Sequence, residues 1–368
     1  MNNRTSSRPD TIFTILTVTL IVVGIFVFTS ASFGLGIEKG IWGSILFSQL
    51  VLGLCEGLLL ASLAVFIPRY LLQKYAFYIL LITLVINLLV FVPDLGFNYG
   101  GATRWIHVVG ISFQPSELLK LVLVIFLSAW LSRIKNDVRD FRYGFLPFIC
   151  IAVIIGGIMI AQPDTGTYLI MLGTALIMFF SAGAKMTHIL AIFVITIFLL
   201  IILILTRPYV KSRIIVFFNP TQDPTGESYQ IQQALLAIGS GELTGKGFGQ
   251  SVQKFQYLPE PIGDSIFAVL GEEFGFVGTL SVVLLFVVYC LRGLHIASWA
   301  KNSFDRLLVT GLVIMTSIQA FMNIGATIGL LPITGVPLPF ISHGGTALMF
   351  TLISAGLVLN VSRTNKPL

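Results

Sequence analysis

The chain has 368 residues, of which 56% are hydrophobic and only 10% are charged, and its formal net charge is +6. Soluble domains carry about 25% charged residues, so this composition excludes a soluble globular protein and indicates an integral membrane protein. The basic residues form no dense run, which argues against nucleic acid as a partner and fits the excess of Lys and Arg in cytoplasmic loops.

Apolar segments long enough to cross a bilayer follow one another along the chain. A helical span needs about 20 mostly apolar residues to cross about 30 Å of hydrocarbon. Ten segments meet this criterion, at residues 11–32, 44–67, 75–92, 115–132, 145–161, 167–183, 187–206, 265–291, 306–330 and 341–361. The first is too long for the apolar core of a signal peptide and is interpreted as an uncleaved span. We therefore expect an all-α integral membrane protein, a bundle of about ten transmembrane helices forming one polytopic domain over residues 1–368.

Lys and Arg are divided unequally between the two sets of connections. With the N-terminus in the cytoplasm, fourteen of the 22 basic residues fall in inner segments, and the short outer ones hold only Lys39 and Arg104. Cytoplasmic loops are enriched in Lys and Arg, whereas long loops follow this rule poorly. Both termini are thus predicted to be cytoplasmic, and the large loop between spans seven and eight, residues 207–264, is predicted to be extracellular.

Glycine, proline and charged residues gather in the outer connections. The run GATRW holds Arg104, the fourth span begins with QPSELLK, and the next outer connection, QPDTGT, holds Asp164. A transporter would show polar residues near the midplane and internal repeats, and the motifs show no such repeat. The one-sided arrangement favours an enzyme that acts at the outer leaflet.

Several of these residues also have purely structural interpretations. Glu117 and Lys120 are three residues apart, so they share a helix face and can neutralise each other, although charges within spans tend to face cavities and mark function. Asp164 follows a proline and can be a turn residue or a helix cap. Arg104 precedes Trp105 and can be an interfacial anchor. The sequence alone leaves these alternatives open.

The large outer loop contains two segments with helical spacing. Residues Tyr209–Phe218 suit a short helix in the headgroup layer. Residues Tyr229–Ile238 place Ile231, Leu235 and Ile238 on one side of a second helix. The five glycines that follow, at positions 239–249, can form simple turns or cradle phosphate oxygens through backbone N–H groups.

A single carboxylate, Asp264, stands where the large loop meets the eighth span. Asp is a favoured N-cap residue, so it can cap this helix, act in catalysis, or do both. Glu272 and Glu273 lie about 12–13 Å further along the helix axis at 1.5 Å per residue. We expect these two carboxylates to find partners within the bundle.

Several motifs in fixed order carry a family resemblance. QPSELLK, QPDTGT, QKFQYLPEPIGDSIF and PLPFISHGG occur in turn, and nearly the whole chain resembles the SEDS family (shape, elongation, division and sporulation), which comprises the FtsW, RodA and SpoVE proteins. The run QKFQYLPEP looks most like the FtsW and SpoVE branch. The chain departs from the usual family pattern at Glu242, Gly263, Ser265 and His343.

The resemblance implies a peptidoglycan glycosyltransferase that polymerises lipid II outside the bacterial cytoplasmic membrane, in cell division or, as in RodA, in elongation. It implies a class B penicillin-binding protein, the cross-linking transpeptidase, as partner, besides membrane lipids. The rival functions are a lipid II flippase and a non-catalytic scaffold for the transpeptidase. A flippase would need a hydrophilic path across the bilayer, and a scaffold would tolerate loss of its acidic residues.

The resemblance also suggests roles for individual residues. The family's essential aspartate matches Asp264, which we expect to be the general base. The candidate substrate-binding residues are Arg104, Glu117, Lys120, Asp164, Lys254 and Glu260. Among them the three cations are assigned to the pyrophosphate, Glu117 orients its neighbouring lysine, and Asp164 positions substrate or a bridging divalent cation. The histidines form no zinc-binding pattern, and no further cofactor is expected.

Overall fold

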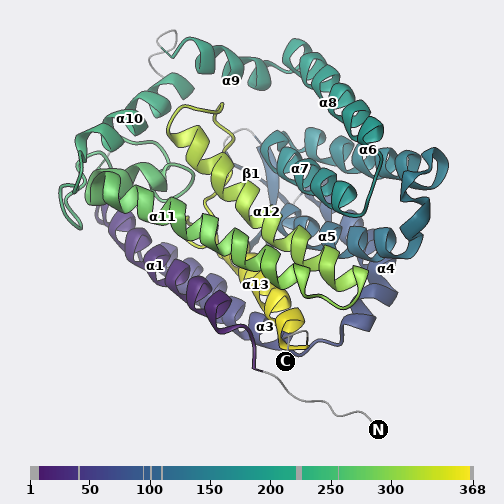
Figure 1. The fold of residues 1–368 in the computed structure, drawn as a ribbon. Helices are drawn as coiled ribbons and strands as arrows, with labels where there is room; N and C mark the ends of the chain where they lie inside the picture. Colours follow the sequence, from purple (N-terminus) through teal and green to yellow (C-terminus); the bar gives the residue numbers. More distant parts are fainter. Residues whose placement is uncertain are drawn as a thin grey trace.

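The computed structural model describes residues 8–39, 42–93, 95–99, 102–108, 111–220, 226–255 and 257–364. Long helices dominate this part of the chain and pack side by side (Figure 1). Every predicted apolar segment coincides with helix: α1 (Thr11–Lys39), α2 (Trp42–Phe47) with η1 (Ser48–Cys55) and α3 (Glu56–Ala64), α4 (Arg69–Leu88), α5 (Pro115–Ile134), α6 (Leu146–Ala161), α7 (Thr165–Ser181), α8 (Met186–Thr206), α11 (Ile266–Ser298), α12 (Ser303–Thr327) and α13 (Gly345–Thr364).

Within the described ranges, eight helical segments are long and apolar enough to cross a membrane by length and composition. Helix α7 is shorter, and α5 carries the charged side chains of Glu117, Lys120 and Arg133. The helical class is therefore confirmed, and the count of ten spans stays a prediction.

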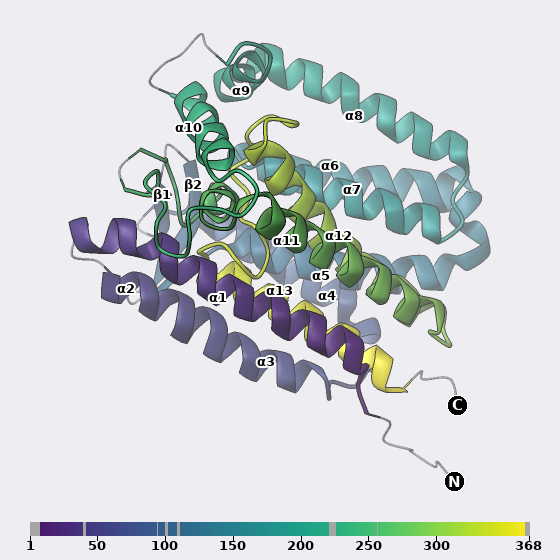
Figure 2. The same ribbon diagram turned by 60° about the vertical axis from the view of Figure 1, so that its left-hand side comes forward.

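Helix α12 lies at the centre of the bundle, and most of its residues are buried. Helix α13 packs against it, α1 and α3 lie beyond on the same side, and α8 lies at the opposite edge (Figure 2). Only Ile192 is buried in α8, so nearly the whole apolar surface of this helix faces outward. Apolar helices exposed in this way are stable in lipid, where the surrounding tails take the place of protein neighbours.

The two ends of the bundle differ in composition. At one end Arg292, near the end of α11, forms an ion pair with Asp10 at 2.5 Å. The N–H of Asp10 also donates to the Ser362 hydroxyl near the end of α13, at 3.0 Å. The start of α1 and the end of α13 therefore lie on this side of the molecule, and the opposite end holds the large loop and the sheet (Figure 2).

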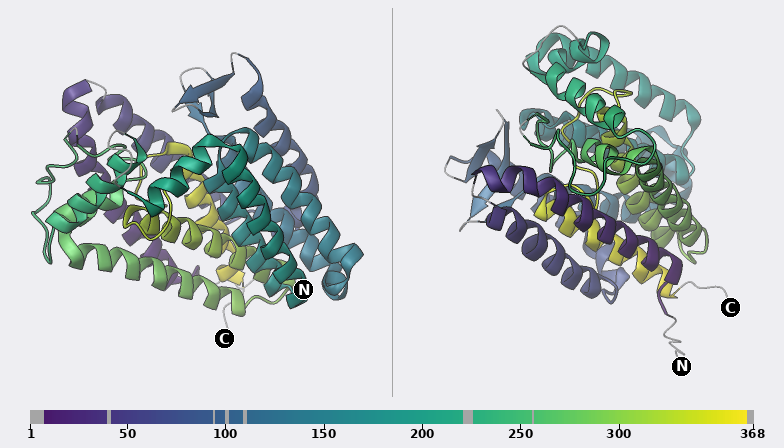
Figure 3. Two further views of the ribbon diagram at one scale, coloured as in Figure 1. Left: turned by 90° about the horizontal axis from the view of Figure 1, so that it is seen from above. Right: turned by 90° about the vertical axis from the view of Figure 1, so that its left-hand side faces the viewer.

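A small antiparallel sheet at this opposite end was not predicted. It comprises β1 (Gly96–Tyr99), β2 (Ala102–Val108) and β3 (Ile111–Phe113) in the order β1-β2-β3. The sheet projects beside α4 and α5 (Figure 3). Strand β3 has only three residues, and β2, with the sequence ATRWIHV, does not alternate strictly between apolar and polar residues, so sequence reasoning described the segment only as a loop.

The large loop contains the two predicted helices, α9 (Pro208–Phe218) and α10 (Glu227–Ser240). The buried face of α10 differs from the prediction, because Leu235 is 43% exposed while Ile231 and Ala234 are buried. Helix α10 approaches α11 closely at Gly271, where a Cβ would lie 2.9 Å from the Ile238 side chain.

Helix α11 is broken at Gly275, whose backbone angles of φ 63° and ψ −161° are not helical. The break frees carbonyl groups that an intact helix would bond internally. The N–H groups of Lys246 and Gly247 donate to the carbonyls of Glu272 and Glu273, both at 3.0 Å. The glycine-rich run therefore serves as a turn that completes the helix, and these two N–H groups are committed to α11.

The second half of α11 is completed from the same loop. The N–H groups of Phe276 and Val277 donate to the carbonyls of Glu242 and Leu243, at 2.9 and 3.1 Å. Irregular backbone at membrane depth is tolerated only where protein satisfies its polar groups. The loop and α11 are so close here that glycine is needed at position 245, because a Cβ on Gly245 would lie 2.2 Å from a backbone oxygen of α11.

Two ion pairs hold the loop at this break. Lys254 is fully buried and its Nζ bonds the Glu273 carboxylate at 2.8 Å, the Ser30 hydroxyl of α1 at 2.9 Å and the Gly249 carbonyl at 2.9 Å. Lys246, which is 37% exposed, bonds the Glu272 carboxylate at 2.7 Å. The expectation that both glutamates find partners is confirmed.

This geometry predicts unequal effects of removing the two lysines. Lys254→Met leaves the Glu273 carboxylate buried without its cation, a loss of about 3–5 kcal/mol for buried pairs. The double variant Lys254→Met/Glu273→Leu removes both charges and is expected to regain most of that stability. Thermal unfolding of the detergent-solubilised protein measures both.

Lys246→Met provides the matched control. Its partner Glu272 keeps hydrogen bonds from Ser251, Val252 and Gln253, so a smaller loss of stability is expected. A Lys254→Met protein as stable as the wild type would contradict the structural role of this lysine.

Candidate functional site

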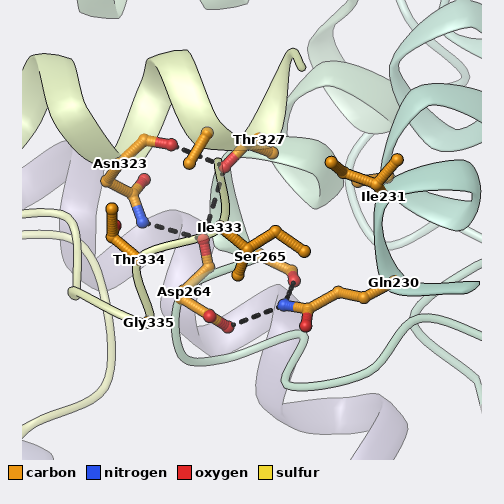
Figure 4. A pocket seen from close by; sticks show the side chains of 11 residues that line it. Gln230, Ile231, Asp264, Ser265, Asn323, Thr327, Ile333, Thr334 and Gly335 are labelled. Carbon is orange, nitrogen blue, oxygen red and sulfur yellow. Dashed lines mark hydrogen bonds between the residues drawn. The ribbon is translucent and has the colours of Figure 1, made fainter. Parts of the chain in front are cut away.

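Asp264 lines a pocket (Figure 4). This pocket lies at the same end of the bundle as the large loop. The pocket wall includes Gln230 from α10, Asn323 and Thr327 from α12, and Thr334 from the connection that follows α12. Segments distant in sequence therefore meet around one carboxylate.

The Asp264 carboxylate does not serve as the helix cap. The N-cap residue of α11 is Ser265, and Asp264 Oδ1 instead accepts a hydrogen bond from Gln230 Nε2 at 3.2 Å. The same amide nitrogen donates to the Ser265 hydroxyl at 3.1 Å. Because the helix start does not use this carboxylate, it remains available to a ligand in the pocket.

Helix α12 fixes the backbone at the acid. Asn323 Nδ2 donates to the Asp264 carbonyl at 2.8 Å and to the Val336 carbonyl at 2.8 Å (Figure 4). Thr327, one turn further along α12, also donates to the Asp264 carbonyl, at 3.4 Å. Helix α12 thus links the segment that carries Asp264 to the segment that carries Val336.

The pKa of Asp264 is raised from its ordinary value to about 6, and burial is the largest cause. The nearby Glu260 carboxylate contributes to this rise, while the hydrogen bond from Gln230 and the charge of Arg213 act against it. At neutral pH the group is mostly ionised yet holds a proton more strongly than an ordinary aspartate, which suits a general base.

Glu260 forms the turn that leads to the acid. Its carbonyl accepts hydrogen bonds from the N–H groups of Gly263 at 3.0 Å and Ser265 at 3.3 Å. Its carboxylate folds back over the turn, since a Cβ on Gly263 would lie 3.4 Å from Glu260 Oε2. Glu260 and Asp264 therefore lie close together in one turn.

Arg213 of α9 lies against the pocket wall. Its Nη1 donates to the Thr334 carbonyl at 3.3 Å. Thr334 and Gly335 both line the Asp264 pocket. Sequence reasoning assigned no role to Arg213, because a contact across 121 residues leaves no local signal.

Arg104 of β2 lies over the start of α7. Its Nε donates to the Gln162 carbonyl at 3.2 Å, and its Nη2 donates to the Pro163 carbonyl. The start of α7 in turn touches the pocket wall, since a Cβ on Gly166 would lie 2.8 Å from the Thr334 carbonyl oxygen. Thr334 thus lies between the Arg104 region and the Asp264 pocket.

Tyr209 of α9 lies where these arginines converge. Burial raises the pKa of its phenol, while the Thr165 side chain and the charges of Arg213, Arg104 and Arg207 act in the opposite direction. The charges of three guanidinium groups therefore act on one phenol near the acid pocket, and such positive charge favours anions.

Asp164 is the N-cap residue of α7, and its Oδ1 accepts a hydrogen bond from the Thr167 N–H at 3.3 Å. The capping interpretation is thus confirmed. Its buried Oδ2 meets no hydrogen-bond donor in the part of the chain that the structure describes. Across that same part, no three His, Cys, Asp or Glu side chains gather as metal ligands.

Glu117 and Lys120 form the predicted ion pair, with 2.8 Å between Oε1 and Nζ and both side chains 3% exposed. They lie in a separate pocket between α5, α12 and α13. Lys120 Nζ also donates to Gln319 Oε1 at 2.6 Å, and Gln319 lies one turn before Asn323 on α12. The pair is therefore linked to the acid pocket through Gln319 of α12 and does not line that pocket itself.

The structure thus groups some of the candidate residues and separates others. Asp264 and Glu260 lie together, and Arg104 and Asp164 lie beside them behind Thr334. Lys120 and Glu117 line a separate pocket. Lys254 forms its ion pair with Glu273, next to the break in α11. The newly recognised neighbours of Asp264 are Gln230 and Arg213.

Comparison with known proteins extends over the same residues. The family model described as a cell cycle protein, FtsW/RodA/SpoVE, matches residues 10–367. The chain is 37% identical to stage V sporulation protein E of Bacillus subtilis over 367 residues, 98% of each chain. It is 40% identical to a probable peptidoglycan glycosyltransferase FtsW of Geobacter metallireducens over 294 residues, 80% of this chain and 78% of the relative.

A solved chain from a peptidoglycan synthase complex that coordinates polymerization and crosslinking matches with a TM-score of 0.79. It is 26% identical, over 97% of this chain and 98% of that one. The apolar helices and these relatives identify a multi-pass membrane protein. The chain therefore belongs to the FtsW, RodA and SpoVE family of cell cycle proteins.

Proposed function

We propose that this protein polymerises lipid II into glycan strands at the outer face of the bacterial cytoplasmic membrane, as a peptidoglycan glycosyltransferase of cell division. The observation that carries the proposal is one carboxylate of raised pKa, Asp264, in a pocket whose wall residue Thr334 is hydrogen-bonded to Arg213. The names of the FtsW relatives support the same activity.

The chemistry needs one base and several positive charges. The donor sugar is linked to a lipid diphosphate, which is already a good leaving group. Asp264 takes the proton of the acceptor 4-hydroxyl while that oxygen bonds to the donor C1, and the diphosphate departs with the electron pair of the broken bond. The reaction does not need the paired acid and nucleophile of glycoside hydrolases.

Arginines suit the developing charge on the diphosphate, because a guanidinium binds phosphate oxygens in a bidentate manner. We assign this role to Arg104 and Arg213, which lie on either side of Thr334. Lys120, neutralised by Glu117, supports α12 through Gln319 instead. Lys254 stabilises the loop at the break in α11.

Asp164 is assigned to position substrate through its free Oδ2. Among the described residues no three His, Cys, Asp or Glu side chains gather as metal ligands, so no step is assigned to a divalent cation. A class B penicillin-binding protein is the proposed partner, in line with the synthase complex that the fold matches. Membrane lipids surround the spans.

The first prediction concerns the base itself. Asp264→Asn keeps the shape of the side chain but cannot accept a proton, so polymerisation of lipid II by the protein with its partner should fall about 10²–10⁴-fold. Glu242→Gln, on the same loop but outside the pocket, is the control and should retain activity. Gel analysis of glycan strands measures both.

If Asp264→Asn polymerised lipid II at the wild-type rate, the assignment of Asp264 as the general base would be refuted. The rival functions give different results in the same preparation. A flippase would move labelled lipid II across liposomes without lengthening it. A scaffold would support growth of a depleted strain even with Asp264→Asn.

The second prediction concerns pH. Because the base must be ionised, kcat/KM should fall as the pH drops below about 6, the pKa of Asp264. This fall is the acidic limb of the pH–rate profile. Glu260→Gln removes a charge that raises this pKa and should move the acidic limb to lower pH. Gln230→Leu removes a hydrogen bond that lowers it and should move the limb to higher pH.

The acidic limb of the pH–rate profile is expected to shift in opposite directions in the two variants. Initial polymerisation rates across the pH range measure these shifts. An acidic limb that stays in place in both variants would assign the titration to another group.

A further inference from the structure

A buried amide in the second span reaches the active-site end of the bundle. Gln49 lies in the π-helical segment η1 between α2 and α3, and it is only 3% exposed. An amide buried among apolar spans is costly unless it is hydrogen-bonded. Its two bonds therefore indicate why a polar side chain occupies this position.

Both ends of the Gln49 amide bind one short segment of backbone. Nε2 donates to the Ser342 carbonyl at 3.1 Å, and Oε1 accepts a hydrogen bond from the Gly344 N–H at 3.0 Å. Two bonds from one rigid planar group fix both the position and the orientation of residues 342–344.

The same segment holds the turn that carries the catalytic acid. The Ser342 hydroxyl donates to the Gly263 carbonyl at 2.7 Å and accepts a hydrogen bond from the Leu338 N–H at 2.7 Å. The N–H of His343 donates to the Ile262 carbonyl at 2.7 Å. The two carbonyls that precede Asp264 are thus fixed by the segment that Gln49 clamps.

The π-helix brings Gln49 to this place. Single π-helical turns inside α-helices carry an extra residue and occur frequently at functional sites. The turn also packs tightly on the start of α13, since a Cβ on Gly53 would lie 3.1 Å from the Gly345 Cα. Close approach of the two backbones lets the amide reach the segment before α13.

We propose that Gln49 is a positioning residue for Asp264: it clamps residues 342–344, which hold the backbone of residues 262–263. It touches no substrate, and its effect on the reaction passes through Ser342 and His343. The catalytic readout of this proposal rests on the proposed glycosyltransferase function.

The test compares Gln49→Leu with a matched variant. Asn360 of α13 is also a buried amide, and its Nδ2 donates to the carbonyls of Ala64 and Ile67, both at 2.8 Å, near the opposite end of the bundle. Asn360→Leu therefore removes a comparable pair of hydrogen bonds without touching the segment at Ser342.

Gln49→Leu is expected to lower kcat per folded enzyme by about 10–100-fold, as misplacement of a catalytic group does, with KM for lipid II within about threefold. Asn360→Leu should leave both constants unchanged. Ser342→Ala should lower kcat as well, and the double variant with Gln49→Leu should lose little more than the worse single variant. An unchanged kcat in Gln49→Leu, or equal losses in Gln49→Leu and Asn360→Leu, would overturn the proposal.

Hydrogen exchange gives a readout that needs no activity. Peptides covering residues 258–267 and 338–345 should exchange faster in Gln49→Leu and not in Asn360→Leu. If the wild type makes no polymer, the proposed function fails, while this exchange pattern still tests the clamp. If Gln49→Leu does not fold, Gln49→Glu replaces it, since it keeps the acceptor for Gly344 and loses the donor to Ser342. Unchanged exchange would refute the clamp.

Discussion

The site depends on the backbone of residues 262–264, whose three carbonyl groups are each fixed by a different donor. The His343 N–H bonds the first, the Ser342 hydroxyl the second and the Asn323 amide the third. These donors come from α12 and from the connection that follows it. The backbone that carries the Asp264 carboxylate is thereby held in one position, as the proposed role in catalysis needs.

The same loop is fixed a second time at the break in α11. Gly275 interrupts the helix, and the glycine-rich run supplies the backbone partners that the break exposes. The buried pair of Lys254 and Glu273 then ties this contact to Ser30 of α1. The large loop is thus anchored at its acidic turn and also before that turn, where its lysine and glycines contact α11.

Local features of the sequence predicted much of this structure, and contacts between distant segments account for the rest. Hydropathy over 20 residues placed the spans, and the spacing of Glu117 and Lys120 placed their ion pair. Gly275 gave no warning of a break, because glycine also occurs in intact transmembrane helices. Gln230 and Arg213 became neighbours of Asp264 only through the folding of the large loop. No periodicity within one segment encodes such contacts.

The most direct test of the central claim is a structure of the protein, with its transpeptidase partner, bound to lipid II and an unreactive donor analogue. The account predicts the acceptor 4-hydroxyl oxygen about 2.6–3.2 Å from the Asp264 carboxylate, with the donor diphosphate against Arg104 and Arg213. An acceptor hydroxyl held elsewhere, for instance beside Glu117 and Lys120 with Asp264 still bonded to Gln230, would contradict it.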